Sequence, residues 1–121
     1  MLKKILIIDD EKDVVSVVSV RLGAAGYQAI PAYSGLEGIK LAIEQKPKLI
    51  ILDLMMPGID GFEVLRRLKA NNQTRNIPVI VFSCKSESDA IFKAQDLGSV
   101  DYIIKPFESQ ELLDLVKRHI I

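Results

Sequence analysis

Five polar residues of this chain could carry chemistry, because each stands at the end of a short apolar run. They are Asp9, Asp10, Asp53, Ser83 and Lys105. Three carboxylates brought together repel one another by a few kcal/mol per pair at roughly 4 Å and an effective dielectric near 20. A lysine and a divalent cation would offset that repulsion. Hard carboxylate oxygens with no neighbouring His or Cys favour Mg²⁺ over zinc.

The same groups meet the needs of phosphoryl transfer. A cation and an ammonium neutralise phosphoryl oxygens, a hydroxyl donates to another oxygen, and an aspartate can attack phosphorus to form an acyl phosphate. The sequence therefore predicts phosphoryl chemistry if the fold brings the five residues to one place.

The elements that must position these residues are strands alternating with helices. Four apolar runs rich in Ile, Leu and Val are continuous, which is typical of strands buried on both faces. The predicted strands are 5–8, 49–52, 79–82 and 102–104, with a weaker one at 28–32. Helical periodicity predicts helices at 12–25, 35–46, 61–71, 86–98 and 108–120. Helical crossovers favour a parallel sheet, in which ligands bind at the carboxyl ends of the strands.

Helix ends carry the expected signals. Gly26 and Gly98 stand where C-terminal caps belong, and Ser34 and Ser86 stand where N-caps belong. The prolines all fall in strand 28–32 or in predicted connections, so none interrupts a predicted helix.

Composition excludes several classes of protein. A chain of 121 residues with 49% apolar residues can form one domain, expected to span 1–121, with its own core. Its net charge of +0 disfavours binding to nucleic acid or to an anionic membrane through bulk charge. A single Cys84 and a single His119 exclude an intramolecular disulfide and structural zinc. We expect Cys84 to be a small, partly buried side chain and His119 to be solvated.

No apolar run has the length of a signal peptide core or of a membrane span. We therefore expect a soluble protein of the cytoplasm. The length leaves two possibilities open, namely a stand-alone domain that acts through another molecule and a domain cut from a larger regulator.

Taken together, four stretches of the chain resemble the receiver domain of bacterial two-component response regulators. The matching stretches are 4–11 (KILIIDDE), 49–62 (LIILDLMMPGIDGF), 79–83 (VIVFS) and 101–107 (DYIIKPF). The resemblance implies an α/β, doubly wound (βα)5 three-layer sandwich of the flavodoxin-like type. Its five parallel strands are expected in the order 2-1-3-4-5.

The resemblance also implies a role for each polar residue at the strand ends. Asp53 would be the phosphoacceptor. Asp10, Asp53 and the backbone carbonyl of Met55 would bind Mg²⁺ directly, and Asp9 would hold it through water. The protein would then be a regulatory phosphoacceptor, with only self-phosphorylation and autodephosphorylation of its own, rather than an enzyme.

A switching role is implied for residues around the phosphoacceptor. Ser83 would turn toward the phosphoryl group on activation and Lys105 would contact it, while Tyr102 would change rotamer. The Lys105–Pro106 peptide bond is expected to be cis, as in the family. Met55 and Lys85 would flank the line of water attack and slow hydrolysis of the acyl phosphate.

Two apolar features are expected to serve partners. On the first helix, Val15, Val18 and Leu22 form the buried stripe, so three other valines lie at its margin or outside it. This patch of Val14, Val17 and Val20 is expected to dock the histidine-bearing domain of a kinase or phosphotransfer protein. Phe92 points outward from the fourth helix, on a face expected to reach an effector protein or a missing output domain.

The residues argue against three rival functions. A phosphatase of the haloacid dehalogenase type needs a second Asp two residues after the nucleophile, where this chain has Met55. A flavin binder of the flavodoxin type needs a phosphate loop after the first strand, where Asp9, Asp10 and Glu11 would repel phosphate. A pseudo-receiver that only binds partners would lack an acidic or Lys position, and none is missing.

Overall fold

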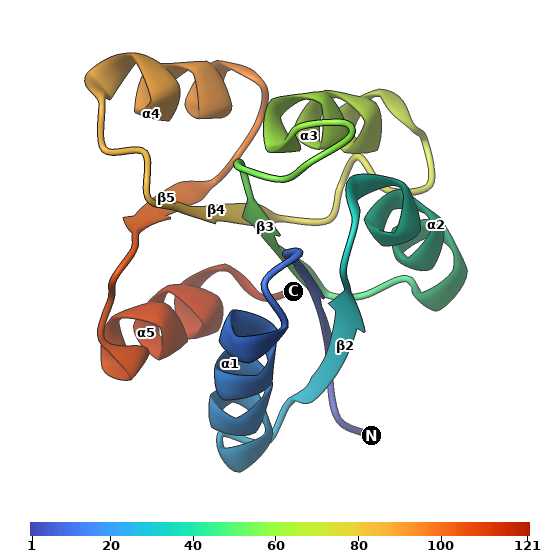
Figure 1. Ribbon diagram of the computed structural model, residues 1–121. Helices are drawn as coiled ribbons and strands as arrows, with labels where there is room; N and C mark the ends of the chain where they lie inside the picture. Colours follow the sequence, from blue (N-terminus) through green and yellow to red (C-terminus); the bar gives the residue numbers. More distant parts are fainter.

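A computed structural model describes residues 1–121 and contains one parallel sheet between two layers of helices (Figure 1). Its strands are β1 (Lys4–Ile8), β2 (Gln28–Ala32), β3 (Leu49–Asp53), β4 (Val79–Ser83) and β5 (Asp101–Ile104). All four pairings are parallel, and the strand order is β2-β1-β3-β4-β5. This is the α/β fold and the strand order that the sequence predicts.

The helices lie on both faces of the sheet, as the continuous apolar strands require. They are α1 (Lys12–Ala24), α2 (Gly35–Gln45), α3 (Gly61–Ala70), α4 (Ser88–Asp96) and α5 (Ser109–His119). Figure 1 shows α1 and α5 on one side, and α2, α3 and α4 on the other. No helix is long and apolar enough to cross a membrane.

Alternate residues of the central strands enter two separate cores. In β1, Ile5 and Ile7 pack in the layer of α1 and α5, whereas Leu6 and Ile8 pack in the layer of the other three helices. Each of these four side chains is fully buried. Because both faces are covered, residues 5–8 of β1 are all apolar and show no hydrophobic alternation in the sequence.

Three of the four predicted helix-end signals are confirmed. The hydroxyl of Ser34 caps α2 by accepting the Glu37 amide, and Gly26 and Gly98 adopt positive φ angles of 94° and 108° after α1 and α4. The prediction that Ser86 caps the fourth helix is wrong, because α4 begins at Ser88 after an extended Glu87.

A local competition explains the late start of α4. The amide of Lys85 donates to the Ser83 hydroxyl, and the carbonyl of Lys85 accepts from the Tyr102 hydroxyl. These two bonds hold the backbone in a non-helical connection between β4 and α4. Side chains from neighbouring strands thus override the helical periodicity that predicts a helix from residue 86.

The outward-facing apolar residues lie where the helical pattern places them. Val17 and Val20 of α1 are 59% and 68% exposed, and Val14 is half-buried. Phe92 is exposed on α4, while Ala94 of the same helix is buried. These residues leave apolar surface on two faces of the molecule.

Candidate functional site

The sheet brings all five chemistry-bearing residues to its carboxyl edge. The register pairs Ile8 of β1 with Leu52 of β3, so that Asp9 and Asp53 follow at the same level. Asp53 in turn lies opposite Phe82, the residue before Ser83. Beyond the end of β5, the Lys105 amide donates to the Ser83 carbonyl at 2.8 Å. Residues distant in sequence thus become neighbours because parallel strands end together.

Three carboxylates form the acidic cluster of the site, which consists of Asp9, Asp10 and Asp53. Each offers one oxygen, and these oxygens all lie within 4.8 Å of one another. Asp9 and Asp53 are buried, and each accepts an amide from two residues ahead: Glu11 to Asp9 at 3.1 Å and Met55 to Asp53 at 3.2 Å. These bonds orient the two carboxylates and leave their second oxygens, both Oδ2, facing the lysine.

Lys105 neutralises part of this charge. Its ammonium lies 2.9 Å from Asp9 Oδ2, 3.6 Å from Asp53 Oδ2 and 3.7 Å from a Glu11 oxygen, and its side chain is only 9% exposed. The ammonium also lies 4.3 Å from the centre of the Phe82 ring. Burial alone would lower the pKa of Lys105, but the hydrogen bond to Asp9 and the nearby carboxylates outweigh burial and raise that pKa. The expected cis peptide bond is present between Lys105 and Pro106.

Asp53 is a carboxylate of the cluster whose acidity the fold alters. Burial raises its pKa from 3.8 to about 6, and the charge of Asp9 adds to this, while Lys105 and the Met55 amide act in the opposite direction. The ammonium of Lys105 therefore does not fully offset the effect of burial on Asp53.

The donor set of this cluster fits a hard divalent cation. It consists of carboxylate oxygens, and neither the single His nor the single Cys belongs to it. Oxygen-only ligands with excess negative charge suit Mg²⁺, which keeps several waters and binds through one or two carboxylates. The partly open side of the cluster at Asp10 leaves room for those waters.

Comparison with known proteins agrees with this geometry. The family model for the response regulator receiver domain matches residues 5–117. The chain belongs to the response regulator receiver domain family. Receiver domains are regulatory phosphoacceptors rather than classical enzymes, and they generally bind Mg²⁺ at an acidic pocket.

Curated relatives of this receiver domain include a regulator of its own size and two longer ones. Sporulation initiation phosphotransferase F of Bacillus subtilis is 34% identical over 120 residues, covering 99% of this chain and 95% of the relative. The DNA-binding dual master transcriptional regulator RpaA of Synechocystis is 40% identical over 94% of this chain. The phosphate regulon transcriptional regulatory protein PhoB of Pseudomonas aeruginosa is 39% identical over 95%. The chain spans 47% and 50% of these last two proteins, about half their length.

Solved structures show the same fold. Chemotaxis protein CheY4 of Vibrio cholerae matches with a TM-score of 0.94 at 26% identity, covering 99% of this chain and 100% of the other. A response regulator of Chloroflexus aurantiacus matches with a TM-score of 0.92 at 31% identity, covering 98% and 97%.

Two hydroxyls meet at the connection after β4 of this receiver domain. Ser83 is buried, and its oxygen accepts the Lys85 amide at 3.1 Å. The half-buried Tyr102 donates its hydroxyl to the Lys85 carbonyl at 2.6 Å. Burial raises the pKa of Tyr102, so its hydroxyl stays protonated and remains a donor. Both backbone groups of Lys85 are therefore held by side chains of the predicted switch residues.

Met55 and Lys85 line the same shallow hollow, and each stands two residues beyond a residue of the predicted site. Met55 is exposed, and the hollow of about 380 Å³ is also lined by Phe62 and Asp60. The Lys85 ammonium lies 6.0 Å from the centre of the Phe62 ring, and the Lys93 ammonium lies 4.3 Å from it. The two residues expected to hinder water are thus neighbours around one hollow.

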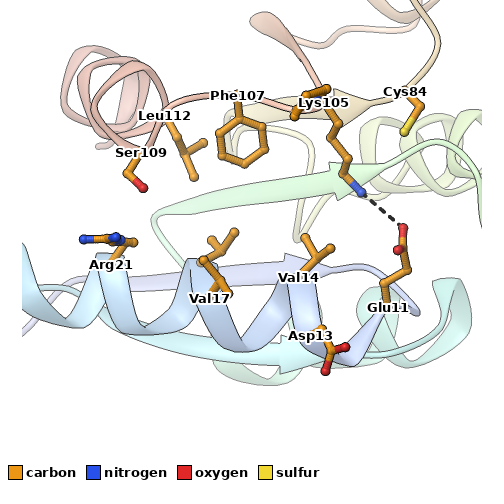
Figure 2. A pocket seen from close by; sticks show the side chains of 12 residues that line it. Glu11, Asp13, Val14, Val17, Arg21, Cys84, Lys105, Phe107, Ser109 and Leu112 are labelled. Atoms are coloured by element: carbon orange, nitrogen blue, oxygen red, sulfur yellow. Dashed lines mark ion pairs between the residues drawn. The ribbon is translucent and has the colours of Figure 1, made fainter.

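Two of the three valines of the α1 patch line a groove. Val14 and Val17 line a groove between α1 and the start of α5, together with Val18, Pro106, Phe107 and Leu112 (Figure 2). Val20 does not line this groove, because its side chain leaves the helix in another direction. The opposite wall of the groove comes from the segment after Lys105. Helical periodicity in α1 alone could not reveal that wall.

Two minor expectations are wrong. Cys84 is exposed rather than partly buried, and it lines one end of the groove. His119 is not a free solvated side chain, because its Nε2 lies 3.1 Å from Asp101 Oδ2 and the imidazole is largely buried. The pairing joins the end of α5 to the start of β5, and only the fold brings them together.

Several residues that shape the site were not singled out from the sequence. Glu11 contributes a third carboxylate to Lys105, and Asp60 caps α3 through the Glu63 amide. Gly61 is packed so tightly against the backbone of Asp53 and Leu54 that a Cβ there would collide with both. Asp60 and Gly61 stand at the start of a predicted helix, and this pair is the sequence signal for the helix cap and for the close approach of Gly61 to the strand backbone.

Proposed function

We propose that Asp53 accepts a phosphoryl group from a histidine of a partner kinase or phosphotransfer protein. The observation that carries this proposal is the buried Asp53 carboxylate, which shares the Lys105 ammonium with Asp9 at the open edge of the sheet. The Asp53 oxygen attacks phosphorus, a new O–P bond forms as the P–N bond breaks, and the electron pair returns to the imidazole. Water later attacks the same phosphorus, releasing phosphate and restoring the carboxylate.

The acidic cluster would hold Mg²⁺ for this reaction. Asp10, Asp53 and the Met55 backbone carbonyl are the direct ligands in this proposal, and Asp9 acts through water. Bound Mg²⁺ supplies positive charge that neutralises phosphoryl oxygens. Burial raises the pKa of Asp53, and a bound cation would favour the ionised carboxylate that the reaction needs.

Lys105 and Ser83 would contact the phosphoryl group once it is attached. The Lys105 ammonium lies 3.6 Å from Asp53 Oδ2 and can move to contact the negatively charged phosphoryl group. Turning the Ser83 hydroxyl toward the phosphoryl group would leave the Lys85 amide without its acceptor. Tyr102 holds the carbonyl of the same residue, so a change at Ser83 would reach Tyr102 and α4 through the connection after β4.

Small phosphodonors would also serve, because the chemistry resides in the receiver domain itself. Self-phosphorylation and autodephosphorylation are then its only intrinsic reactions. Met55 and Lys85 line one hollow, two residues beyond Asp53 and Ser83 respectively, and would hinder the attacking water. We expect the acyl phosphate to persist for minutes rather than seconds.

The partner would dock beside the site on α1. The groove supports this role for Val14 and Val17, because both residues line it and Phe107 faces them. Val20 would contribute only to a surface wider than the groove. Phe92 on α4 would contact an effector protein or an output domain. This domain would bind neither nucleic acid nor a membrane directly. The domain would act in the cytoplasm.

Intact mass after incubation with Mg²⁺ and acetyl phosphate tests the assignment. The wild-type chain should gain one phosphoryl group, and Asp53→Asn should gain none. Asp13→Asn, which changes an exposed acid at the start of α1, should retain the adduct as a matched control. No adduct on the wild type, or an equal adduct on Asp53→Asn, would exclude Asp53 as the phosphoacceptor.

A further inference from the structure

The groove between α1 and α5 has the dimensions of a small-molecule site. Its volume is about 490 Å³, within the range of roughly 300–1,000 Å³ of ligand pockets. Val14, Val17 and Val18 form one wall, and Phe107 and Leu112 form the other. Figure 2 shows the Val17 and Leu112 side chains facing one another across the groove. An apolar body therefore fits between the two walls.

Charge is distributed unevenly along the groove. At the end near the phosphoacceptor, the Glu11 carboxylate is paired with the Lys105 ammonium at 3.7 Å. At the other end lies Arg21, an exposed residue of the last turn of α1 that takes part in none of the ion pairs of the structure. Figure 2 places Ser109 across from Arg21, so a guanidinium and a hydroxyl both belong to that end of the groove. The groove thus has one free cation, with a hydroxyl donor beside it.

We propose that this groove binds an amphipathic organic anion. The apolar part lies along Val14, Val17 and Phe107, and the anionic head meets Arg21 and Ser109. From Val14 to Arg21 the helix rises about 10 Å at 1.5 Å per residue, close to the length of an octyl chain. The head is directed to the Arg21 end because the carboxylates of Glu11 and Asp9 repel it from the other.

A ligand in this groove would regulate the proposed phosphotransfer. It would cover Val14 and Val17, the residues assigned above to the docking of the histidine-bearing partner, so this consequence rests on the proposed function. The phosphoacceptor would remain open from its own side, because Asp53 does not line the groove. Binding itself is independent of phosphorylation and can be tested separately.

Titration of the ¹⁵N-labelled chain with octanoate tests the site. We expect saturable amide shifts confined to α1, the segment after Lys105 and the start of α5. Octanol should bind about three-fold more weakly, and octylammonium more weakly still, because an exposed Arg–carboxylate pair contributes only modestly in water. Arg21→Gln should abolish the preference for the anion while leaving octanol binding unchanged.

Two variants of one helix serve as a matched pair. Val17→Glu puts a charge into the groove and should abolish octanoate binding, whereas Val20→Glu, outside the groove, should leave it unchanged. Octanoate at saturation should not change phosphorylation by acetyl phosphate. Shifts centred on Phe92, equal binding of octylammonium, or inhibition of that phosphorylation would overturn the proposal. A chain that binds octanoate but accepts no phosphoryl group would contradict only the proposed function.

Discussion

The ammonium of Lys105 lies 2.9 Å from Asp9 Oδ2, although the two residues stand at nearly opposite ends of the chain. Asp9 is fully buried, and this ion pair links the loop after β1 to the end of β5. The pair therefore has two effects, because it neutralises a buried carboxylate and holds the lysine beside Asp53.

Lys105→Met should destabilise the domain and abolish its response to phosphorylation. Removing the ammonium leaves the carboxylates of Asp9 and Asp53 without their cation, and breaking a buried pair from one side costs about 3 kcal/mol. Urea unfolding at neutral pH without Mg²⁺ measures this loss. Addition of Mg²⁺ should restore part of it by supplying positive charge. Unchanged stability of the variant without Mg²⁺ would show that the carboxylates are solvated rather than paired.

Asp53→Asn should stabilise the metal-free domain at neutral pH. The folded state raises the pKa of Asp53 from 3.8 to about 6. Folding therefore favours the protonated form of Asp53 over the ionised form. Stability of the wild type should therefore fall as pH rises from about 4 to about 6, with the loss complete above that window. Allowing for solvent screening, we expect the variant to be more stable than wild type by about 1–2 kcal/mol at pH 8.

The control for this prediction is pH itself. At pH 4 both proteins carry a neutral group at residue 53 in the folded state, so their unfolding midpoints should converge. Mg²⁺ should also reduce the difference at pH 8, since it favours the ionised carboxylate. A wild type whose stability rises between pH 4 and pH 6 relative to Asp53→Asn would contradict the assigned pKa direction.

Gly61→Ala should destabilise the domain and impair phosphorylation, because a Cβ at this position collides with the backbone of Asp53 and Leu54. The backbone at Gly61 also donates to the Leu54 carbonyl at 3.0 Å, so α3 cannot move away freely. We expect a loss of at least about 2 kcal/mol in thermal or urea unfolding, comparable with overpacking of a core.

Gly23→Ala is the matched control for that substitution. Gly23 lies within α1, and a Cβ there meets nothing within 4 Å. Alanine has the higher helix propensity, so this variant should gain about 0.5–1 kcal/mol. Similar effects of the two substitutions would mean that backbone flexibility, rather than the contact at Asp53, determines the result.

Tyr102→Phe should loosen the connection between β4 and α4 while leaving the acidic cluster intact. The variant loses the hydroxyl that donates to the Lys85 carbonyl at 2.6 Å, a bond whose net contribution is about 1 kcal/mol. Faster hydrogen exchange of amides in the segment 84–88 measures the effect. Mg²⁺ affinity should stay unchanged, since Tyr102 is not among the proposed ligands. Exchange that is faster throughout the sheet would indicate general destabilisation instead.

The amino-acid sequence by itself determined the alternation of strands and helices and the identity of the residues at the strand ends. Continuous apolar runs such as 49–52 are specified locally, because a strand buried on both faces must be apolar at every position. Parallel pairing then obliges Asp9, Asp53, Ser83 and Lys105 to meet at one edge. The convergence of these four residues was therefore predictable from the sequence.

Contacts between distant segments were decided only by the tertiary structure. The second wall of the groove at Phe107, the pairing of His119 with Asp101 and the third carboxylate at Glu11 all depend on which surfaces face one another after folding. The start of α4 also depends on such contacts. The hydroxyls of Ser83 and Tyr102 hold a backbone segment for which local periodicity predicts a helix. Propensity acts between near neighbours in the chain, whereas these contacts exist only once the sheet has brought remote residues together.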